Sequence, residues 1–117
     1  MTSERKLIVL DVDSTLTQDE GIDLLAEYVS AEAAHKVAEI TARAMAGEID
    51  FAESLTARVE ALAGLSLERV AEATARVRLS KGAHTLVRSA QAAGHLVAAV
   101  SGGFHEMIDP LAAELGL

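Results

Sequence analysis

The sequence predicts an α/β fold in which a parallel sheet carries a long helical insert. Two short runs of mainly branched apolar residues, at 7–10 and 96–100, are typical of strands buried on both faces, as in parallel sheets. The long stretch between them repeats its apolar positions at helical spacing. One helix would suffice to connect two parallel strands. We therefore expect residues 20–80 to form an inserted helical cap, and residues 1–19 and 81–117 to form the core.

Capping residues divide the insert and the segment after it into five helices. Their amino-terminal caps are Ser30, Asp50 and Ser66, and the glycines that end or open helices are Gly47, Gly64, Gly82 and Gly94. The helices are predicted over 22–29, 30–47, 50–64, 66–77 and 82–94. A last helical pattern begins near Phe104 and is interrupted by Pro110. We expect a kink there, or a new helix with Asp109 as its cap.

Composition narrows the function classes. The 117 residues are enough for one domain, and 18 acidic against 10 basic residues give a net charge of −8, which argues against a nucleic-acid partner. There is no cysteine, so neither a disulfide framework nor thiolate chemistry is available. The apolar run at 7–10 is too short for a signal peptide or a membrane span. We therefore expect no membrane partner and take the cytoplasm as the default location.

Two acids follow the first strand directly. Asp11 and Asp13 would lie at the carboxyl end of that strand, where open α/β sheets bind their ligands. Two carboxylates in such a place favour a hard divalent cation between them. The alternative is a plain turn with a helix cap, because these residue types favour both.

A second polar turn follows the second strand. Ser101, Gly102 and Gly103 offer a hydroxyl, close backbone approach and a helix amino terminus, which together suit a phosphate. If the strands are parallel neighbours, both turns share one end of the sheet and indicate phosphoryl transfer. The alternative for the second turn is an ordinary helix cap.

Arg58 occupies an unusual position in the third predicted helix. Together with Phe51, Leu55 and Leu62 it falls on one apolar stripe. An arginine in such a stripe either extends its head group to water or faces a ligand.

These motifs resemble a known family. The segment 11–15 (Asp-Val-Asp-Ser-Thr) is similar to the first motif of the haloacid dehalogenase superfamily of phosphotransferases, and 100–103 (Val-Ser-Gly-Gly) to its second. In the insert, Glu20, residues 45–51 and the pattern at 54–64 resemble the cap of phosphoserine phosphatases. The resemblance covers 7–117 and implies a Rossmann-like haloacid dehalogenase core, with only its first two sheet strands present, and an inserted helical-bundle cap.

The resemblance also implies roles for the core residues. Asp11 would be the nucleophile that forms an aspartyl-phosphate, and Asp13 the general acid and base. Mg²⁺ would be held by Asp11 and by the backbone carbonyl of Asp13. The turn at 101–103 would bind the phosphoryl oxygens, through the Ser101 hydroxyl and the backbone amide of Gly102.

The cap residues would select the substrate. Arg58 would bind the carboxylate of phosphoserine and Glu20 its ammonium. Met45 and Phe51 would wall the pocket and exclude water. The alternatives are an acid favoured near a helix amino terminus for Glu20, and ordinary packing for Met45 and Phe51.

The family's later lysine and its acidic glycine turn do not occur in this sequence. We therefore expect the 117-residue chain alone to be inactive, and to be marginally stable or self-associating, for instance as a homodimer. Two alternatives to a phosphoserine phosphatase stay open. One is a related phosphotransferase acting on homoserine or another small amino acid, and the other is a non-catalytic helical module that binds an anion or a partner.

Overall fold

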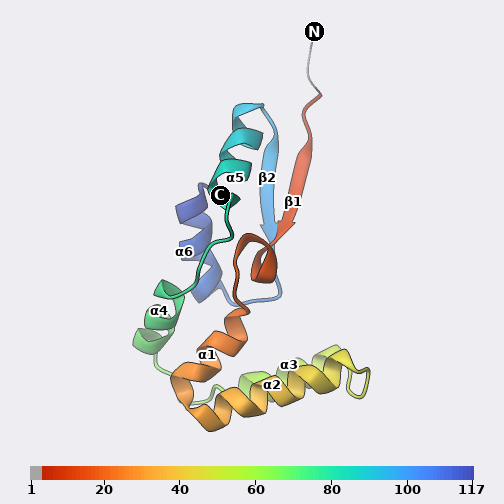
Figure 1. The fold of residues 1–117 in the computed structure, drawn as a ribbon, viewed down its shortest axis with the longest axis vertical. Coiled ribbons are helices and arrows are strands. Elements are labelled where there is room, and N and C mark those ends of the chain that lie inside the picture. The colour runs from red at the N-terminus through yellow and green to blue at the C-terminus, as the bar shows by residue number, and fades with distance from the viewer. Residues whose placement is uncertain (1–3) are drawn as a thin grey trace. The chain divides into compact units, whose positions relative to one another are not determined.

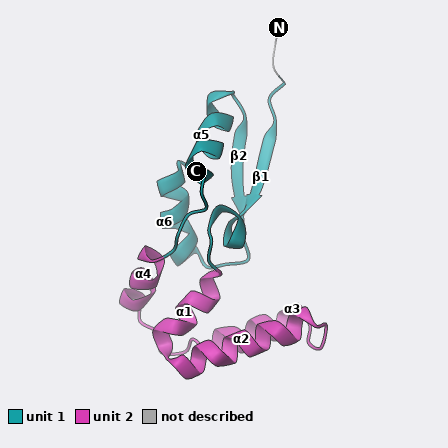
Figure 2. Cartoon of the chain, viewed as in Figure 1, with its two compact units in different colours: residues 1–19, 77–117 teal, residues 20–76 magenta. Residues whose placement is uncertain are grey.

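The computed structural model describes residues 4–117, which form two compact units. One unit contains the residues up to Asp19 together with Val77–Leu117, and the other contains Glu20–Arg76 (Figure 2). The second boundary lies at 76 rather than at the predicted 80. The reason is that residues 77–80 pair with the chain just after the first strand, where Leu79 bridges to Thr17 in antiparallel fashion.

This pairing, which we call the clasp, joins residues 15–18 to residues 78–80. The Gln18 amide donates to the Arg78 carbonyl at 2.8 Å, and the Ser80 amide donates to the Leu16 carbonyl at the same distance. The Arg78 guanidinium also forms an ion pair with Asp19 at 2.9 Å. Hydrogen bonding to this carboxylate raises the pKa of Arg78 above its ordinary value. The clasp therefore fixes the two places where the chain leaves and rejoins the first unit.

The first unit is built on a two-stranded parallel sheet (Figure 1). Strand β1 (Leu7–Asp11) pairs with β2 (Leu96–Val100), in a register that runs from Leu7 opposite Leu96 to Asp11 opposite Val100. Helix α5 (Ala83–Ala92) comes before β2 in the chain, and helix α6 (His105–Leu115) follows it. The buried cluster consists of Val12, Leu16, Ala83, Val87 and Leu115. The predicted α/β fold with adjacent parallel strands is confirmed.

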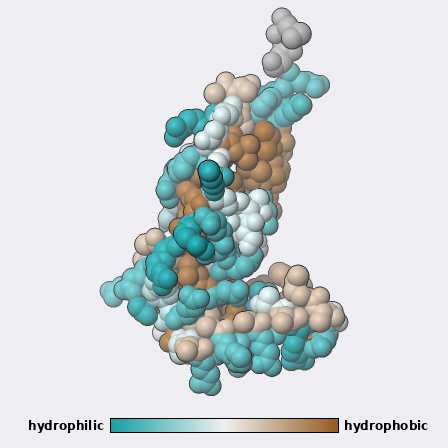
Figure 3. Space-filling model, in the orientation of Figure 1, coloured by the Kyte–Doolittle hydropathy of each residue, from teal (hydrophilic) through white to brown (hydrophobic). Residues whose placement is uncertain are grey.

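The sequence predicted strands that are buried on both faces, and this prediction is wrong. Leu7, Val9 and Val100 are 63%, 54% and 60% exposed. Burial alternates along β1, and Leu10 packs against the cluster that includes Val87 of α5. The described helices of this unit therefore cover one face of the sheet, and apolar atoms gather at the surface beside the strands (Figure 3).

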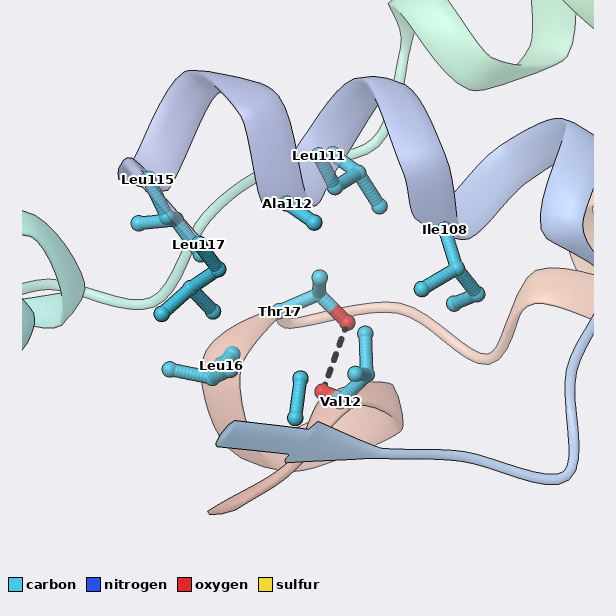
Figure 4. A pocket seen from close by; sticks show the side chains of 9 residues that line it. Val12, Leu16, Thr17, Ile108, Leu111, Ala112, Leu115 and Leu117 are labelled. Atoms are coloured by element: carbon cyan, nitrogen blue, oxygen red, sulfur yellow. Dashed lines mark hydrogen bonds between the residues drawn. The ribbon is translucent and has the colours of Figure 1, made fainter. Parts of the chain in front are cut away.

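A small apolar cavity separates α6 from the turn that follows β1 (Figure 4). Its volume is about 10 Å³, and its lining is formed by Val12, Leu16, Thr17, Ala99, Ile108, Leu111, Ala112, Leu115 and Leu117. A water needs about this much room and two to four polar partners, whereas the lining is almost wholly apolar. This cavity is therefore a packing defect of the core and not a ligand site.

Helix α6 runs without interruption through Pro110, so the alternative of a new helix capped by Asp109 is wrong. A proline in this place removes the hydrogen bond to the carbonyl of Glu106, four residues earlier, and crowds that carbonyl; Glu106 is an exposed residue. Met107 and Leu111, in the turns before and after the proline, are buried. Their burial anchors both turns to the core.

The second unit is a bundle of four helices, α1 (Gly21–Val29), α2 (Ala31–Met45), α3 (Phe51–Glu60) and α4 (Leu67–Ala75). Helix α1 packs on α2 and α4, and α2 packs on α3. The side chains of Ser30, Asp50 and Ser66 each accept a hydrogen bond from the amide three residues on, as predicted for caps. Helix α3 ends at Glu60 rather than at the predicted residue 64, and α4 ends at Ala75 rather than at 77. Among residues 4–117, no helix is long and apolar enough to cross a membrane.

Candidate active site

The sheet register brings the two predicted motifs to one edge. Asp11 is the last residue of β1 and lies opposite Val100, the last residue of β2. Ser101 follows directly, so the acidic turn and the serine turn leave the sheet side by side. Asp11 is exposed, and its Oδ1 accepts a hydrogen bond of 2.9 Å from the Val12 amide. Its Oδ2 accepts none from a described residue. The carboxylate is therefore oriented by its own turn while one oxygen stays accessible.

Asp13 lies in a single irregular helical turn, η1 (Val12–Leu16), closed by a 3.0 Å hydrogen bond from the Thr17 amide to the Val12 carbonyl. Within it Ser14 has φ 57° and ψ 17°, the left-handed conformation that non-glycine residues seldom adopt. Such strain costs about 1 kcal/mol or more and persists where the surroundings enforce it. Thr17 is one enforcing residue, because it is 2% exposed and its hydroxyl lies 2.9 Å from the Asp19 carbonyl.

The turn after β2 is organised by Ser101. Its Oγ accepts a 2.9 Å hydrogen bond from the Gly103 amide. Helix α6 begins beyond it, with Phe104 as its cap residue and no side chain capping its first amides. The alternative that Ser101 is an ordinary helix cap is therefore wrong. Uncapped amides at a helix start favour anions, which agrees with the predicted phosphate-binding turn.

Gly103 has a steric role in this turn. A Cβ at residue 103 would lie 3.1 Å from Ser101 Oγ and 3.5 Å from a side-chain carbon of Ile108, whereas one at Gly102 would meet nothing within 4 Å. Both glycines are exposed. A hollow of about 350 Å³ between β2 and α6 is bordered by Ser101 and Gly103 but not by Asp11. It therefore differs from the edge where the two turns meet.

The predicted substrate-selecting residues all lie in the second unit. Glu20 is the cap residue of α1, although its side chain does not cap the helix. Arg58 is half-buried on α3, and its Nε donates to the Ser54 carbonyl at 3.3 Å. Met45 ends α2 and is 85% exposed, and Phe51 begins α3 and is 68% exposed. Neither side chain is taken up by packing within the bundle, so the alternative of ordinary cap packing is wrong for both.

The sequence analysis assigned no role to Asp23 and named Ser54 only as part of the cap pattern at 54–64. Asp23 Oδ1 and Ser54 Oγ are the buried side-chain polar atoms without a hydrogen-bond partner among the described residues. Burial raises the pKa of Asp23, Glu20 and Glu27 raise it further, and Arg58 lowers it. The available signal was spacing, because Asp23 follows Glu20 by three residues and Ser54 precedes Arg58 by four.

The metal-binding residues are only partly represented. Asp11 supplies a carboxylate oxygen and Asp13, in the turn that follows, a backbone carbonyl oxygen, and oxygen ligands are those that Mg²⁺ prefers. Within the part of the chain that the structure describes, no group of three histidine, cysteine or acidic residues could hold a metal ion. Asp11 and Asp13 therefore fit a magnesium site without completing it.

Nearly the whole chain is similar to known proteins. The phosphoserine phosphatase of Streptomyces coelicolor is 50% identical over 113 residues, covering 97% of this chain and 27% of that protein. The phosphoserine phosphatase of Streptococcus thermophilus is 48% identical over 117 residues, covering 100% of this chain and 54% of that protein. This chain thus spans about half the length, or less, of these relatives.

Solved structures give the same picture. One described as a substrate-bound phosphoserine phosphatase complex has a TM-score of 0.89 at 36% identity, covering 99% of this chain and 54% of that one. Another, a phospho-aspartyl intermediate analogue of phosphoserine phosphatase, has a TM-score of 0.87 at 37% identity, covering 98% and 54%. The family of haloacid dehalogenase-like hydrolases matches residues 8–117. The chain therefore belongs to the haloacid dehalogenase-like hydrolases.

Proposed function

We propose that this chain carries the nucleophile and the substrate-selecting cap of a phosphoserine phosphatase, which hydrolyses O-phospho-L-serine to L-serine and phosphate. The observation that carries the reaction is the register that sets Asp11 and Ser101 at one sheet edge. The substrate is supported by relatives that bear this name at 48–50% identity across nearly the whole chain. The reaction would be the last step of serine biosynthesis, in the cytoplasm.

The chemistry proceeds in two displacements. An Asp11 oxygen attacks phosphorus, the bond from phosphorus to the serine oxygen breaks, and Asp13 gives its proton to that oxygen. Asp13 then takes a proton from a water that attacks the aspartyl-phosphate, which releases phosphate and restores Asp11. Two observations support these roles of Asp11 and Asp13. Residues 11–15 resemble the family's first motif, and the turn orients Asp11 through the Val12 amide.

The surrounding groups stabilise charge. The Ser101 hydroxyl, the Gly102 amide and the open start of α6 would hold the phosphoryl oxygens. Asp11 and the Asp13 carbonyl would hold Mg²⁺, which offsets the repulsion between the carboxylate and the phosphate. Neutral or cationic groups are needed around the anionic phosphate, because the chain itself has a net charge of −8 and repels anions.

The cap supplies recognition of the amino acid. Arg58 would bind the serine carboxylate through its planar fork, and Glu20 would bind the ammonium. The exposed apolar side chains of Met45 and Phe51 would form the wall that excludes water.

The test is phosphate release from O-phospho-L-serine by the full-length gene product with Mg²⁺. Asp11→Asn should abolish turnover, because an amide is a poor nucleophile, whereas Asp109→Asn, a matched exposed aspartate on α6, should leave it unchanged. Phosphate transfer to added homoserine with little hydrolysis would show the related phosphotransferase instead. Equal activity of Asp11→Asn and the wild type would favour a non-catalytic module and overturn the proposal.

A further inference from the structure

Asp19, which follows the clasp residues 15–18, is held by Arg78 at both of its carboxylate oxygens. Oδ1 accepts a hydrogen bond from the Arg78 guanidinium at 2.9 Å, and Oδ2 accepts one from the Arg78 backbone amide at 2.8 Å. The Asp19 side chain is only 18% exposed, whereas that of Arg78 is 65% exposed. An exposed ion pair by itself fixes little, but a shielded carboxylate with a hydrogen bond on each oxygen has a defined position.

The backbone carbonyl of the same residue holds the turn that carries Asp13. It accepts a hydrogen bond from the Ser14 amide at 3.3 Å and another from the Thr17 hydroxyl at 2.9 Å. Ser14 directly follows Asp13 and has the left-handed φ of 57°. Asp19 therefore connects Arg78, at its side chain, to the strained turn, at its carbonyl.

The turn depends on such support because its conformation is locally unfavourable. The backbone is extended at Asp13, with ψ 129°, and left-handed at Ser14, so the chain changes direction directly after the acid. The segment 11–20 contains no glycine that would adopt this conformation without strain. A serine stays in the left-handed region only where surrounding contacts hold it there. Relaxation of Ser14 would therefore displace the neighbouring Asp13.

Resting on the proposed function, in which Asp13 transfers the proton, we propose that Asp19 is a positioning residue for Asp13. Anchored by Arg78, its carbonyl keeps Ser14 in the left-handed conformation and thereby keeps Asp13 where proton transfer requires it. General acid and base catalysis depends on hydrogen-bond reach, so a small displacement of the acid slows the chemical step. Asp19 acts through Ser14 and not on the substrate.

The kinetic test uses the full-length gene product with Mg²⁺ and O-phospho-L-serine. Asp19→Ala removes both carboxylate acceptors, and kcat should fall about tenfold while KM stays within about twofold, because other residues bind the phosphate and the amino acid. Arg78→Ala removes the guanidinium but keeps the backbone amide that donates to Oδ2. Its kcat should therefore fall less, by about threefold.

A matched ion pair elsewhere provides the control. Arg69 and Glu72 on α4 form an exposed pair at 2.6 Å, and Glu72→Gln should leave both kcat and KM unchanged. Thermal melts of each variant give the folded fraction at the assay temperature. A purely structural role of Asp19 predicts a lower melting temperature for Asp19→Ala with an unchanged kcat per folded molecule, which the proposal does not.

Two results would overturn the proposal: a kcat per folded molecule of Asp19→Ala within about twofold of the wild type, or a rise in KM as large as the fall in kcat. If Asp19→Ala does not fold, Arg78→Ala decides, and a kcat equal to that of the wild type contradicts the role of Asp19.

The failure of the proposed function is a separate outcome. If the wild type does not hydrolyse phosphoserine, the hold of Asp19 on Ser14 is measured by NMR. The coupling constant between the amide and Hα protons of Ser14 reports φ, and it should change in Asp19→Ala or Arg78→Ala and stay constant in Glu72→Gln. An unchanged coupling in all three variants would refute the role of Asp19.

Discussion

Gly103→Ala probes whether the turn after β2 depends on the position of one hydroxyl. The added Cβ would lie 3.1 Å from Ser101 Oγ, tighter than most real Cβ contacts, so the hydroxyl has to move by a few tenths of an ångström or rotate. Rotation breaks its 2.9 Å hydrogen bond from the residue 103 amide, which is worth about 1 kcal/mol. An off-rotamer side chain adds about 0.5–1.5 kcal/mol. We therefore expect a loss of about 1–2 kcal/mol in phosphate binding.

The assay is kcat/KM for phosphoserine in the full-length gene product, which should fall about 5- to 30-fold. A double-mutant cycle with Ser101→Ala isolates the cause, because removing the hydroxyl removes the clash. In that background Gly103→Ala should cost little more, since Ile108 at 3.5 Å is an ordinary contact. Gly102→Ala, whose Cβ meets nothing and whose amide remains, should cost less than Gly103→Ala. Equal losses from Gly103→Ala with and without the Ser101 hydroxyl would refute this reasoning.

Three further predictions concern stability. Burial raises the pKa of Asp23 above its ordinary value of 3.8, so the stability that its proton provides is lost as the pH rises through the folded pKa. Asp23→Asn, which stays neutral, should therefore raise the melting temperature at about pH 7. The gain should shrink toward pH 3.8, as measured by circular-dichroism melts. Val87→Ala, at a fully buried site, should cost about 2–3 kcal/mol in denaturant unfolding, against less than about 1 kcal/mol for the half-exposed Leu86→Ala. Sedimentation should show concentration-dependent association of the 117-residue chain through the sheet face that exposes Leu7 and Val9, and Val9→Lys should reduce it; a monomer at all concentrations would contradict this.

Local signals in the sequence predicted most of the secondary structure. Ser30, Asp50 and Ser66 cap helices through contacts only three residues long, and such contacts form irrespective of the rest of the fold. The parallel pairing of the strands followed from two apolar runs that both end in polar turns. Parallel pairing places the carboxyl ends of both strands at the same edge of the sheet. The sequence therefore also predicted that Asp11 and Ser101 lie at one edge.

What the sequence did not predict depends on contacts between distant residues. The exposure of Val9 depends on which helices cover the sheet, and the unbroken helix at Pro110 depends on the burial of Met107 and Leu111 in the turns on either side of it. Asp23 resembles an ordinary acid in a first helical turn, and only its buried, unpartnered oxygen distinguishes it. The left-handed Ser14 is likewise imposed by its surroundings. The roles of Glu20, Met45, Phe51 and Arg58 stay predictions.

The clasp has a consequence for how this kind of protein changes over evolutionary time. Because residues 15–18 and 78–80 are paired directly, the ends of the insert are held together whatever lies between them. Closing a longer loop costs little extra, about 0.6 kcal/mol for each doubling of its length. An insert anchored in this way can be lengthened, shortened or exchanged for another without rebuilding the sheet that carries Asp11. Under the proposed function, in which the insert selects the substrate and Asp11 performs the chemistry, substrate choice would diversify separately from the chemical step, by replacement of one contiguous segment of the gene.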